Sequence, residues 1–160
     1  MSVPGWMRSM LQRRGVAFEE AHHRPVFTAQ QVAAELHVTG HHLAKVVVVM
    51  ADGKPVELVL PATRKVVLER VREALGAGEV RFASEAEMER TFPECEVGAV
   101  PPVDNWPGVP LLMDPTMMVE GDIVMQAGTH EDAVRMHYDD WFRMVRPRIA
   151  SFADAPLTVH

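Results

Sequence analysis

The sequence predicts a mixed α and β protein of the α+β class, in which helices pack around a mostly antiparallel sheet. The run Val46–Met50 is β-branched and apolar on both alternating faces, which is typical of a central strand covered on both sides. Asp52-Gly53 is a turn signal, and a second apolar run, Val56–Leu60, follows it. Residues 45–60 therefore predict an antiparallel hairpin with a five-residue connection.

Helical signals account for most of the remaining chain. Two segments, Thr28–Gln31 and Ser84–Glu87, have the spacing of a capping box, which marks the start of a helix. Elsewhere apolar residues recur at helical spacing and end at a glycine or proline. The predicted helices are a short one ending at Gly15 and others over residues 29–37, 64–75, 84–91 and 138–144. Short strands are predicted at residues 80–83, 109–113, 123–126 and 133–136, and an irregular, ordered loop at 92–110.

Length and composition predict one domain over residues 1–160, with residues 147–160 as a loosely held tail. Hydrophobic residues make up 48% and charged residues 24%, values that exclude a disordered chain. The longest apolar run is far shorter than the ~18 residues of a membrane span, and the N-terminus does not resemble a secretion signal. We therefore expect a cytoplasmic location and no membrane partner.

The net charge of −6 disfavours a protein that grips long nucleic acids through many phosphates, so we expect no DNA partner and only local contact with RNA. The single cysteine, Cys95, rules out an intrachain disulfide. Glutamates flank it on both sides and would raise its thiol pKa, so it is a poor nucleophile. Only three lysines are present, at positions 45, 54 and 65, which makes the location of each one informative.

Lys45 is the residue most suggestive of chemistry, because it stands at the mouth of a strand that continues as four valines. Removing its charge from water costs several kcal/mol unless an opposite charge or polar group compensates. Two interpretations remain open. Its ammonium group extends past the strand end to water, or it faces a pocket and meets an anion or a carbonyl oxygen.

Three further segments are candidates for a site. The loop Gly98–Pro102 offers two backbone N–H groups after the glycine and is stiffened by prolines, which suits donors directed at an oxyanion. Asp114 ends an apolar run, and Gly128–His130 lies between two predicted strands. Each of the three is also explained as an ordinary turn, so none decides the function alone.

Several common catalytic and binding motifs are missing from the sequence. The histidine pairs at 22–23 and 41–42 lack an HExxH pattern or a cysteine cluster, so we expect no metal and no other cofactor. The chain has no phosphate-binding GxxxxGK loop, no dinucleotide-binding GxGxxG and no GxSxG nucleophile elbow.

Taken in order, these segments resemble the YbaK-like trans-editing proteins, which share a fold with the editing domain inserted in bacterial prolyl-tRNA synthetases. The order of the segments carries the resemblance, which extends over about residues 22–142. The matching stretches are His23–Thr28, Leu43–Val48, Val59–Pro61, Glu96–Pro102, Leu112–Asp114 and Gln126–His130.

The resemblance implies a partly barrel-like sheet and hydrolysis of the ester that joins a wrongly attached small amino acid to the 3′ end of a tRNA, without a metal. It implies that Lys45 is catalytic and lies at the adenosine and ester end. The loop is expected to line the aminoacyl pocket, and other matching residues complete it. The substrate-binding residues so implied are Thr28, Gly98, Ala99, Val100, Pro101, Pro102, Asp114, Gly128, Thr129 and His130.

The resemblance leaves the substrate open. Val46 and Val47 follow the lysine where alanine-specific members usually have Asn and an aromatic-containing strand, so the amino acid stays open among alanine, serine, threonine and cysteine. The expected partner is the aminoacyl-tRNA acceptor end, with an aminoacyl-tRNA synthetase as a further candidate. The alternatives are a non-catalytic module that binds tRNA ends, a synthetase or a nucleotide, and, with less support, a small-molecule esterase.

Overall fold

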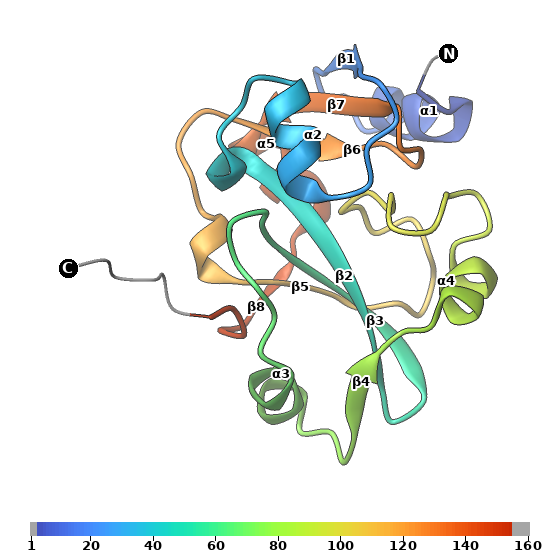
Figure 1. Cartoon of the computed structure of the whole chain (residues 1–160), viewed down its shortest axis with the longest axis vertical. Coiled ribbons are helices and arrows are strands. Elements are labelled where there is room, and N and C mark those ends of the chain that lie inside the picture. Colours follow the sequence, from blue (N-terminus) through green and yellow to red (C-terminus); the bar gives the residue numbers. More distant parts are fainter. Residues whose placement is uncertain (1–2, 155–160) are drawn as a thin grey trace.

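The computed structural model describes residues 3–154 and places helices around one eight-stranded sheet (Figure 1). The helices of this part of the chain are α1 (Gly5–Arg13), α2 (Ala29–Glu35), α3 (Leu68–Leu75), α4 (Glu85–Thr91), α5 (Tyr138–Val145) and two 3-10 turns, η1 (Gly40–His42) and η2 (Pro115–Met117). The strands are β1 (Glu19–His22), β2 (Leu43–Ala51), β3 (Lys54–Pro61), β4 (Val80–Phe82), β5 (Leu111–Met113), β6 (Asp122–Gln126), β7 (Asp132–His137) and β8 (Arg148–Ile149). None of these helices is long and apolar enough to cross a bilayer.

The sheet runs in the order β1-β7-β6-β2-β3-β5-β8, and β4 pairs with the far end of β2. The pairs β1–β7, β6–β7, β2–β3 and β2–β4 are antiparallel, whereas β2–β6, β3–β5 and β5–β8 are parallel. The predicted mixed α and β class is confirmed, and antiparallel pairs outnumber parallel ones only by four to three in this part of the chain.

β2 is central, as predicted, and both of its faces are covered. On one face, Ala44 and Val48 belong to the main core with residues of α1, β6 and β7. On the other, Leu43 packs beneath α2 while Val49 packs with α3 and the C-terminal segment. Because side chains alternate along a strand, Lys45 shares the second face and lies between these two apolar clusters.

The local signals for helix starts and for the hairpin are confirmed. Thr28 and Ser84 each form a complete capping box with Gln31 and Glu87. The hairpin is tighter than the predicted five-residue connection, because Ala51 pairs with Lys54 and only Asp52 and Gly53 turn the chain. Both turn residues have positive φ angles, 49° and 81°, as a two-residue turn of the primed type requires.

Two sequence predictions need correction. The helix predicted over 64–75 begins only at Leu68, because Val66 forms a bridge with Ala153 and the N–H of Val67 donates to the carbonyl of Phe152. The strands β1 and β8 were not predicted, because both are short and polar and form only where a distant strand offers an edge.

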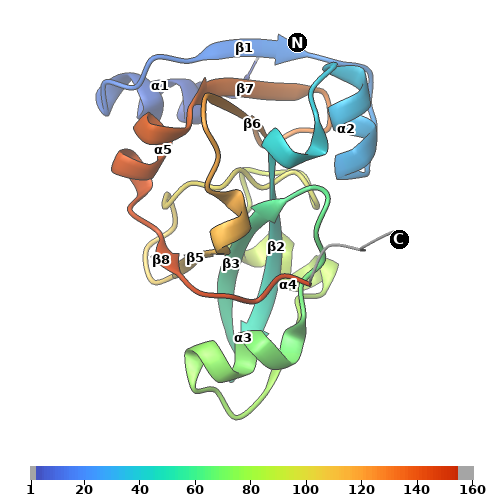
Figure 2. The ribbon, with the colours of Figure 1, turned by 90° about the vertical axis from the view of Figure 1, so that its left-hand side faces the viewer.

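The C-terminal segment is packed rather than loose over its described part. Residues 150–154, here called the strap, follow β8 and cross the face of β2 and β3 (Figure 2). Phe152 is fully buried, and Ala153 is 6% exposed. The expectation of a loosely held tail is therefore wrong for residues 147–154, because apolar burial holds them, and residues 155–160 lie outside the described residues.

Asp114 fastens the strap to the sheet. One carboxylate oxygen accepts the N–H groups of Phe152 and Ala153, both at 2.8 Å, and the other accepts the N–H and hydroxyl of Thr116. Burial alone would raise the pKa of Asp114, but these hydrogen bonds outweigh burial and lower it.

Replacing Asp114 by Asn should release the strap, because an amide has one acceptor oxygen where the carboxylate uses two. We expect a loss of at least about 2 kcal/mol in the free energy of unfolding, measured by urea titration. Asp139→Asn is the matched control, since that side chain is 70% exposed and should leave stability nearly unchanged. Equal stability of the two variants would show that the strap does not depend on Asp114.

Glu57 is a buried carboxyl group in the main core. It is 1% exposed, and neither carboxyl oxygen has a hydrogen-bond partner among the described residues. Burial, with a smaller contribution from Asp104, raises the pKa of Glu57 well above its usual value of 4.5. The side chain is therefore held in its neutral form over a pH range in which the unfolded chain ionises.

This burial predicts a pH-dependent stability difference between the protein and Glu57→Gln. Below pH 4.5 the carboxyl is protonated in both the folded and the unfolded state, and its contribution is constant. As pH rises above 4.5 only the unfolded state ionises, so the protein should lose up to about 1.4 kcal/mol per pH unit relative to the variant. Denaturant titrations at pH 5 and pH 8 test this, and parallel stability curves would contradict it.

Candidate functional site

Lys45 lies where β2 is held between two neighbours. It pairs with Leu60 on β3, and the residue before it, Ala44, pairs with Met125 on β6. Gln126 is therefore the next residue along β6 beside Lys45. The strand pairing on both sides fixes the lysine backbone, so the side chain emerges at a defined point of the sheet.

The environment of Lys45 destabilises its charge. Burial lowers the pKa of Lys45 below its usual value of 10.5, the carboxylate of Asp154 raises it, and the nearby cation of Lys65 lowers it. Since desolvation is the largest of these effects, the ammonium group is poorly hydrated in the free protein. A ligand that brings negative charge, actual or developing, would stabilise it.

The predicted loop over residues 92–110 is ordered and closely packed. Ala99 and Val103 are fully buried, and Val100 is 6% exposed. Gly98 has a φ angle of 86°, which favours glycine over other residues. The prolines after Val100 continue this packed segment, and the carbonyl of Pro102 accepts the indole N–H of Trp141 at 2.8 Å.

One of the two backbone donors predicted after Gly98 is free within the described residues, and the other is occupied. The N–H of Ala99 donates to the carbonyl of Glu96 at 3.0 Å, so it is occupied. Within residues 3–154, by contrast, the N–H groups of Gly98 and Val100 have no hydrogen-bond acceptor. Gly98 thus supplies a donor that the sequence analysis had assigned to the next residue.

The segment Gly128–His130 packs against this loop. The N–H of Gly128 donates to the carbonyl of Ala99 at 2.9 Å, and its own carbonyl accepts the N–H of Glu96 at 2.8 Å. The Glu96 carboxylate accepts the N–H of His130. Thr129 uses its hydroxyl within the turn, where it donates to Asp132 at 2.7 Å.

The His130 ring joins the loop to the start of α2. It is 8% exposed, and its Nε2 lies 2.8 Å from the carbonyl of Val97. Because that oxygen only accepts, Nε2 must carry the hydrogen, which leaves Nδ1 as an acceptor without a partner among the described residues. Phe27 lies against the ring at 4.7 Å between centroids and is itself 71% exposed.

Two of the predicted substrate-binding residues have structural roles in this state. Thr28 uses its hydroxyl to cap α2 by accepting the N–H of Gln31. Asp114 uses both carboxylate oxygens to hold Thr116 and the strap. Thr28 still adjoins the loop through its neighbour Phe27, whereas Asp114 belongs to the strap side of the sheet.

The predicted site residues thus form two groups that meet at the end of β6. The loop and the segment Gly128–His130 form one group, and Lys45 with the strap forms the other. Gly128 follows Gln126 by two residues, a chain distance of about 7 Å.

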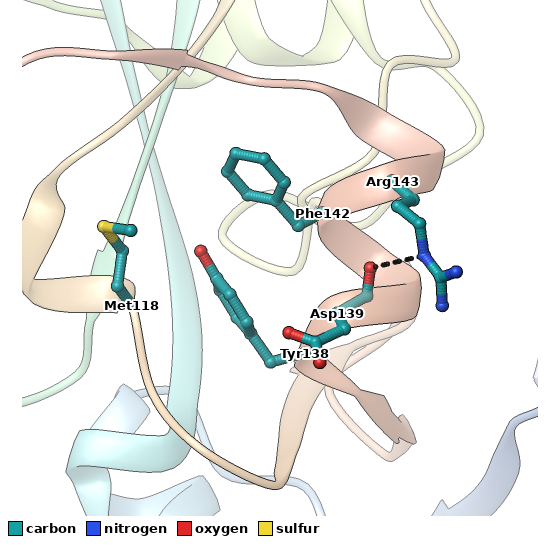
Figure 3. Close-up of a pocket in the computed structure, with 5 residues that line it drawn as sticks. All are labelled: Met118, Tyr138, Asp139, Phe142 and Arg143. Atoms are coloured by element: carbon teal, nitrogen blue, oxygen red, sulfur yellow. Dashed lines mark hydrogen bonds between the residues drawn. The ribbon is translucent and has the colours of Figure 1, made fainter.

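One cavity lies away from the predicted site residues. This cavity of about 430 Å³ is lined by Met118, Tyr138, Asp139, Phe142 and Arg143. Figure 3 shows Met118 facing the two aromatic rings across it, with Arg143 hydrogen-bonded to the Asp139 carbonyl on the helix side. No predicted site residue lines this cavity, and nothing in its lining suggests hydrolysis.

Cys95 and the histidine pairs acquire no catalytic arrangement. Burial, reinforced by Glu94 and Glu57, raises the pKa of the Cys95 thiol to about 12, which confirms it as a poor nucleophile. In the part of the chain that the structure describes, no group of three or more His, Cys, Asp or Glu side chains is arranged to hold a metal ion.

The structure adds residues that sequence reasoning missed. Lys65 and Asp154 influence the charge of Lys45 although they lie 20 and 109 positions from it in the chain. Phe27 is a large exposed ring beside the loop. The scarcity of lysine in the chain was a signal for Lys65, but nothing local marked Asp154.

Comparisons with known proteins show which family the chain belongs to. The sequence model of the aminoacyl-tRNA editing domain matches residues 23–144. The chain is 25% identical over 149 residues to the multifunctional Ser/Thr-tRNA deacylase ProXp-y of Escherichia coli K12, covering 90% of this chain and 89% of that protein. The same protein from Escherichia coli O157:H7 matches equally.

Solved structures show the same fold. The structure of a hypothetical protein, APE2540, superposes with a TM-score of 0.83 at 19% identity, covering 92% of this chain and 98% of that one. A candidate trans-editing enzyme for prolyl tRNA synthetase gives 0.81 at 18% identity, covering 96% and 100%. With the family match spanning most of the chain and the predicted loop packed in place beside Gly128 and His130, this protein belongs to the aminoacyl-tRNA editing domain family.

Proposed function

We propose that this protein is a trans-editing aminoacyl-tRNA deacylase that hydrolyses the ester of a small, mischarged amino acid in the cytoplasm, where tRNAs are charged. The observation that carries the proposal is the poorly hydrated Lys45 at the junction of the two groups of site residues. Family membership and the deacylase named among the relatives support the reaction class.

The chemistry follows from what the site offers. A water oxygen attacks the ester carbonyl carbon, and the carbonyl oxygen becomes an oxyanion in the tetrahedral intermediate. Lys45 and the free N–H groups of Gly98 and Val100 are the donors available to stabilise that charge. Collapse breaks the bond to the ribose oxygen, which leaves with a proton, and a free amino acid and tRNA result.

The protein supplies no evident general base, and a ribose hydroxyl of the substrate is suited to help position the water. Catalysis in this proposal therefore depends on placing the ester and stabilising the oxyanion. This explains why an enzyme of the family needs neither a nucleophilic side chain nor a metal.

The amino acid is proposed to be small, because the loop that would enclose it is tightly packed around Ala99 and Val100. Serine and threonine are the first candidates, since the curated relative is named for them. Pocket size discriminates a methylene by only ~1–3 kcal/mol, so alanine and cysteine belong in the same test. Service to a synthetase, as the description of one structural neighbour suggests, is a further proposal.

Replacing Lys45 by Ala should abolish most of the activity. We expect wild type to release one or two amino acids from a panel of tRNAs charged with alanine, serine, threonine, cysteine and proline. The variant should lose roughly 10²–10³-fold in rate, the usual effect of removing one oxyanion donor. Single-turnover deacylation measures both the amino-acid preference of wild type and the rate lost in the variant.

Lys54→Ala is the matched control, because that lysine is exposed and lies at the opposite end of β3. It should retain wild-type rates. If no charged tRNA is hydrolysed above its spontaneous rate, or Lys45→Ala equals wild type, a tRNA-binding module without hydrolysis becomes the better interpretation.

The lowered pKa of Lys45 predicts a decline in activity at alkaline pH. Oxyanion stabilisation needs the protonated amine, so the enzymatic rate should fall as pH rises through a pKa below 10.5. Lys45→Arg keeps its charge throughout this range, and whatever activity it retains should not show the decline. The test is to measure deacylation rates from pH 7 to 10 and correct them for spontaneous hydrolysis. If the rates of wild type and Lys45→Arg fall together, the protonated amine of Lys45 does not stabilise the oxyanion.

A further inference from the structure

Four of the sixteen basic residues of this acidic protein lie beside the strap. The chain carries a net charge of −6 and only three lysines, yet two of those lysines and two arginines gather here. The cationic cluster, as we call it, consists of Lys45, Arg64, Lys65 and Arg70. Nothing in the proposed hydrolysis requires the last three.

Backbone pairing between residues 64–67 and the strap fixes the cluster. Lys65 and Asp154 exchange hydrogen bonds of 2.9 Å, one from the Lys65 N–H to the Asp154 carboxylate and one from the Asp154 N–H to the Lys65 carbonyl. Arg64 donates to the carbonyl of Asp154 at 2.9 Å, and Arg70 to that of Ala153 at 2.7 Å. The guanidinium groups of Arg64 and Arg70 are therefore held in place by main-chain carbonyls rather than by carboxylates.

Lys45 belongs to the same electrostatic cluster. Its strand partner Leu60 stands one residue before the end of β3, and Arg64 follows only four residues later. The charges of Asp154 and Lys65 both act on the pKa of Lys45. Lys45 and Lys65 are therefore close enough for their charges to interact, and Arg64 and Arg70 both donate to the strap.

The carboxylates near the cluster offset its charge only in part. Asp154 accepts the Lys65 N–H and Asp114 accepts the N–H groups of the strap, so both place a negative charge beside these cations. Glu69 is bonded to Arg72. Lys65 is exposed, and its ammonium group makes no hydrogen bond within residues 3–154. The four cations outnumber these two carboxylates and suit a ligand with more than one negative charge.

We propose that Arg64, Lys65 and Arg70 bind the phosphates that precede the terminal adenosine of the tRNA acceptor strand. This inference rests on the proposed function, in which Lys45 meets the ester at the end of that strand. Phosphates are the only negatively charged groups near the ester, so cations that lie beside Lys45 would guide the strand toward it. This arrangement also explains how an acidic protein binds RNA locally.

Lys65→Glu is the decisive variant, because the Lys65 side chain holds no part of the fold. Lys54→Glu is the matched control, with the same change of charge on an exposed lysine at the hairpin end. Each is compared with wild type in single-turnover deacylation at varied enzyme concentration and salt. Two substrates are used: an aminoacyl-tRNA and the corresponding 3′-aminoacyl-adenosine, which has no phosphate.

With the aminoacyl-tRNA at low salt, Lys65→Glu should raise the enzyme concentration that gives half of the maximal rate by at least about fivefold. The maximal rate itself should not change. The variant should reduce the salt dependence by about 0.7 in the slope of log K against log salt, the value for one phosphate of a single strand. Lys54→Glu should change neither quantity, and aminoacyl-adenosine should be hydrolysed equally by all three proteins.

Other outcomes overturn the assignment. If Lys65→Glu and Lys54→Glu weaken binding of the aminoacyl-tRNA equally, the effect comes from the net charge of the protein and not from a site at Lys65. If Lys65→Glu hydrolyses aminoacyl-adenosine more slowly than wild type, Lys65 belongs to the ester site instead. If wild type hydrolyses neither substrate, the proposed function fails, and binding of an uncharged acceptor-stem hairpin tests the cluster by itself. Weaker binding by Lys65→Glu alone would then support the phosphate site, while equal binding by the two variants would exclude it.

Discussion

The two-sided burial of β2 is the constraint on which the rest of the structure depends. The strand pairs with β3, β4 and β6, and apolar clusters cover both of its faces. A lysine at its beginning can neither shift its register nor turn its side chain into the core. The position of Lys45 is therefore fixed by hydrophobic packing at many other residues, which is a reliable way to place one charged group.

Three ionisable groups that are buried or half-buried, Glu57, Asp114 and Lys45, are treated by the fold in three ways. Glu57 is kept neutral in the core without any partner. Asp114 is kept charged by four hydrogen bonds that also hold the strap. Lys45 is left half-buried, with its charge only partly offset by Asp154. Of the three groups, only Lys45 has a charge that the protein leaves partly uncompensated, so only Lys45 can bind an anionic ligand strongly. Lys45 rather than either carboxyl group is therefore the centre of the proposed site.

Most of the fold could be predicted from the sequence, because its signals are local. Capping boxes at Thr28 and Ser84, the valine run of β2 and the Asp52-Gly53 turn each depend on a few neighbouring residues. The errors fall where a distant segment decides the outcome. Val66 was predicted to be helical from the spacing of apolar residues. In the structure its backbone is extended, because it forms a bridge with Ala153 on the distant strap.

The candidate site shows the same division. The resemblance implied that the Gly98 loop and Gly128–His130 belong to one site, but not how they contact each other. The occupation of the Ala99 N–H was not anticipated, since it depends on how the loop folds back on Glu96. Lys65 and Asp154 lie outside every recognisable motif. Their relation to Lys45 follows only from the strap, and no local pattern encodes it.

The strap also determines when the site is complete. Lys65 and Asp154 are 89 residues apart in the chain. The entropy lost when so long a loop closes must be offset by contacts that exist only once most of the sheet has formed. During synthesis the chain emerges from its N-terminus, so β2 and β3 can pair long before residues 152–154 are available. A nascent chain would hold Lys45 in a different electrostatic environment, without Asp154. The charged surroundings of the site are thus among the last features of the protein to assemble.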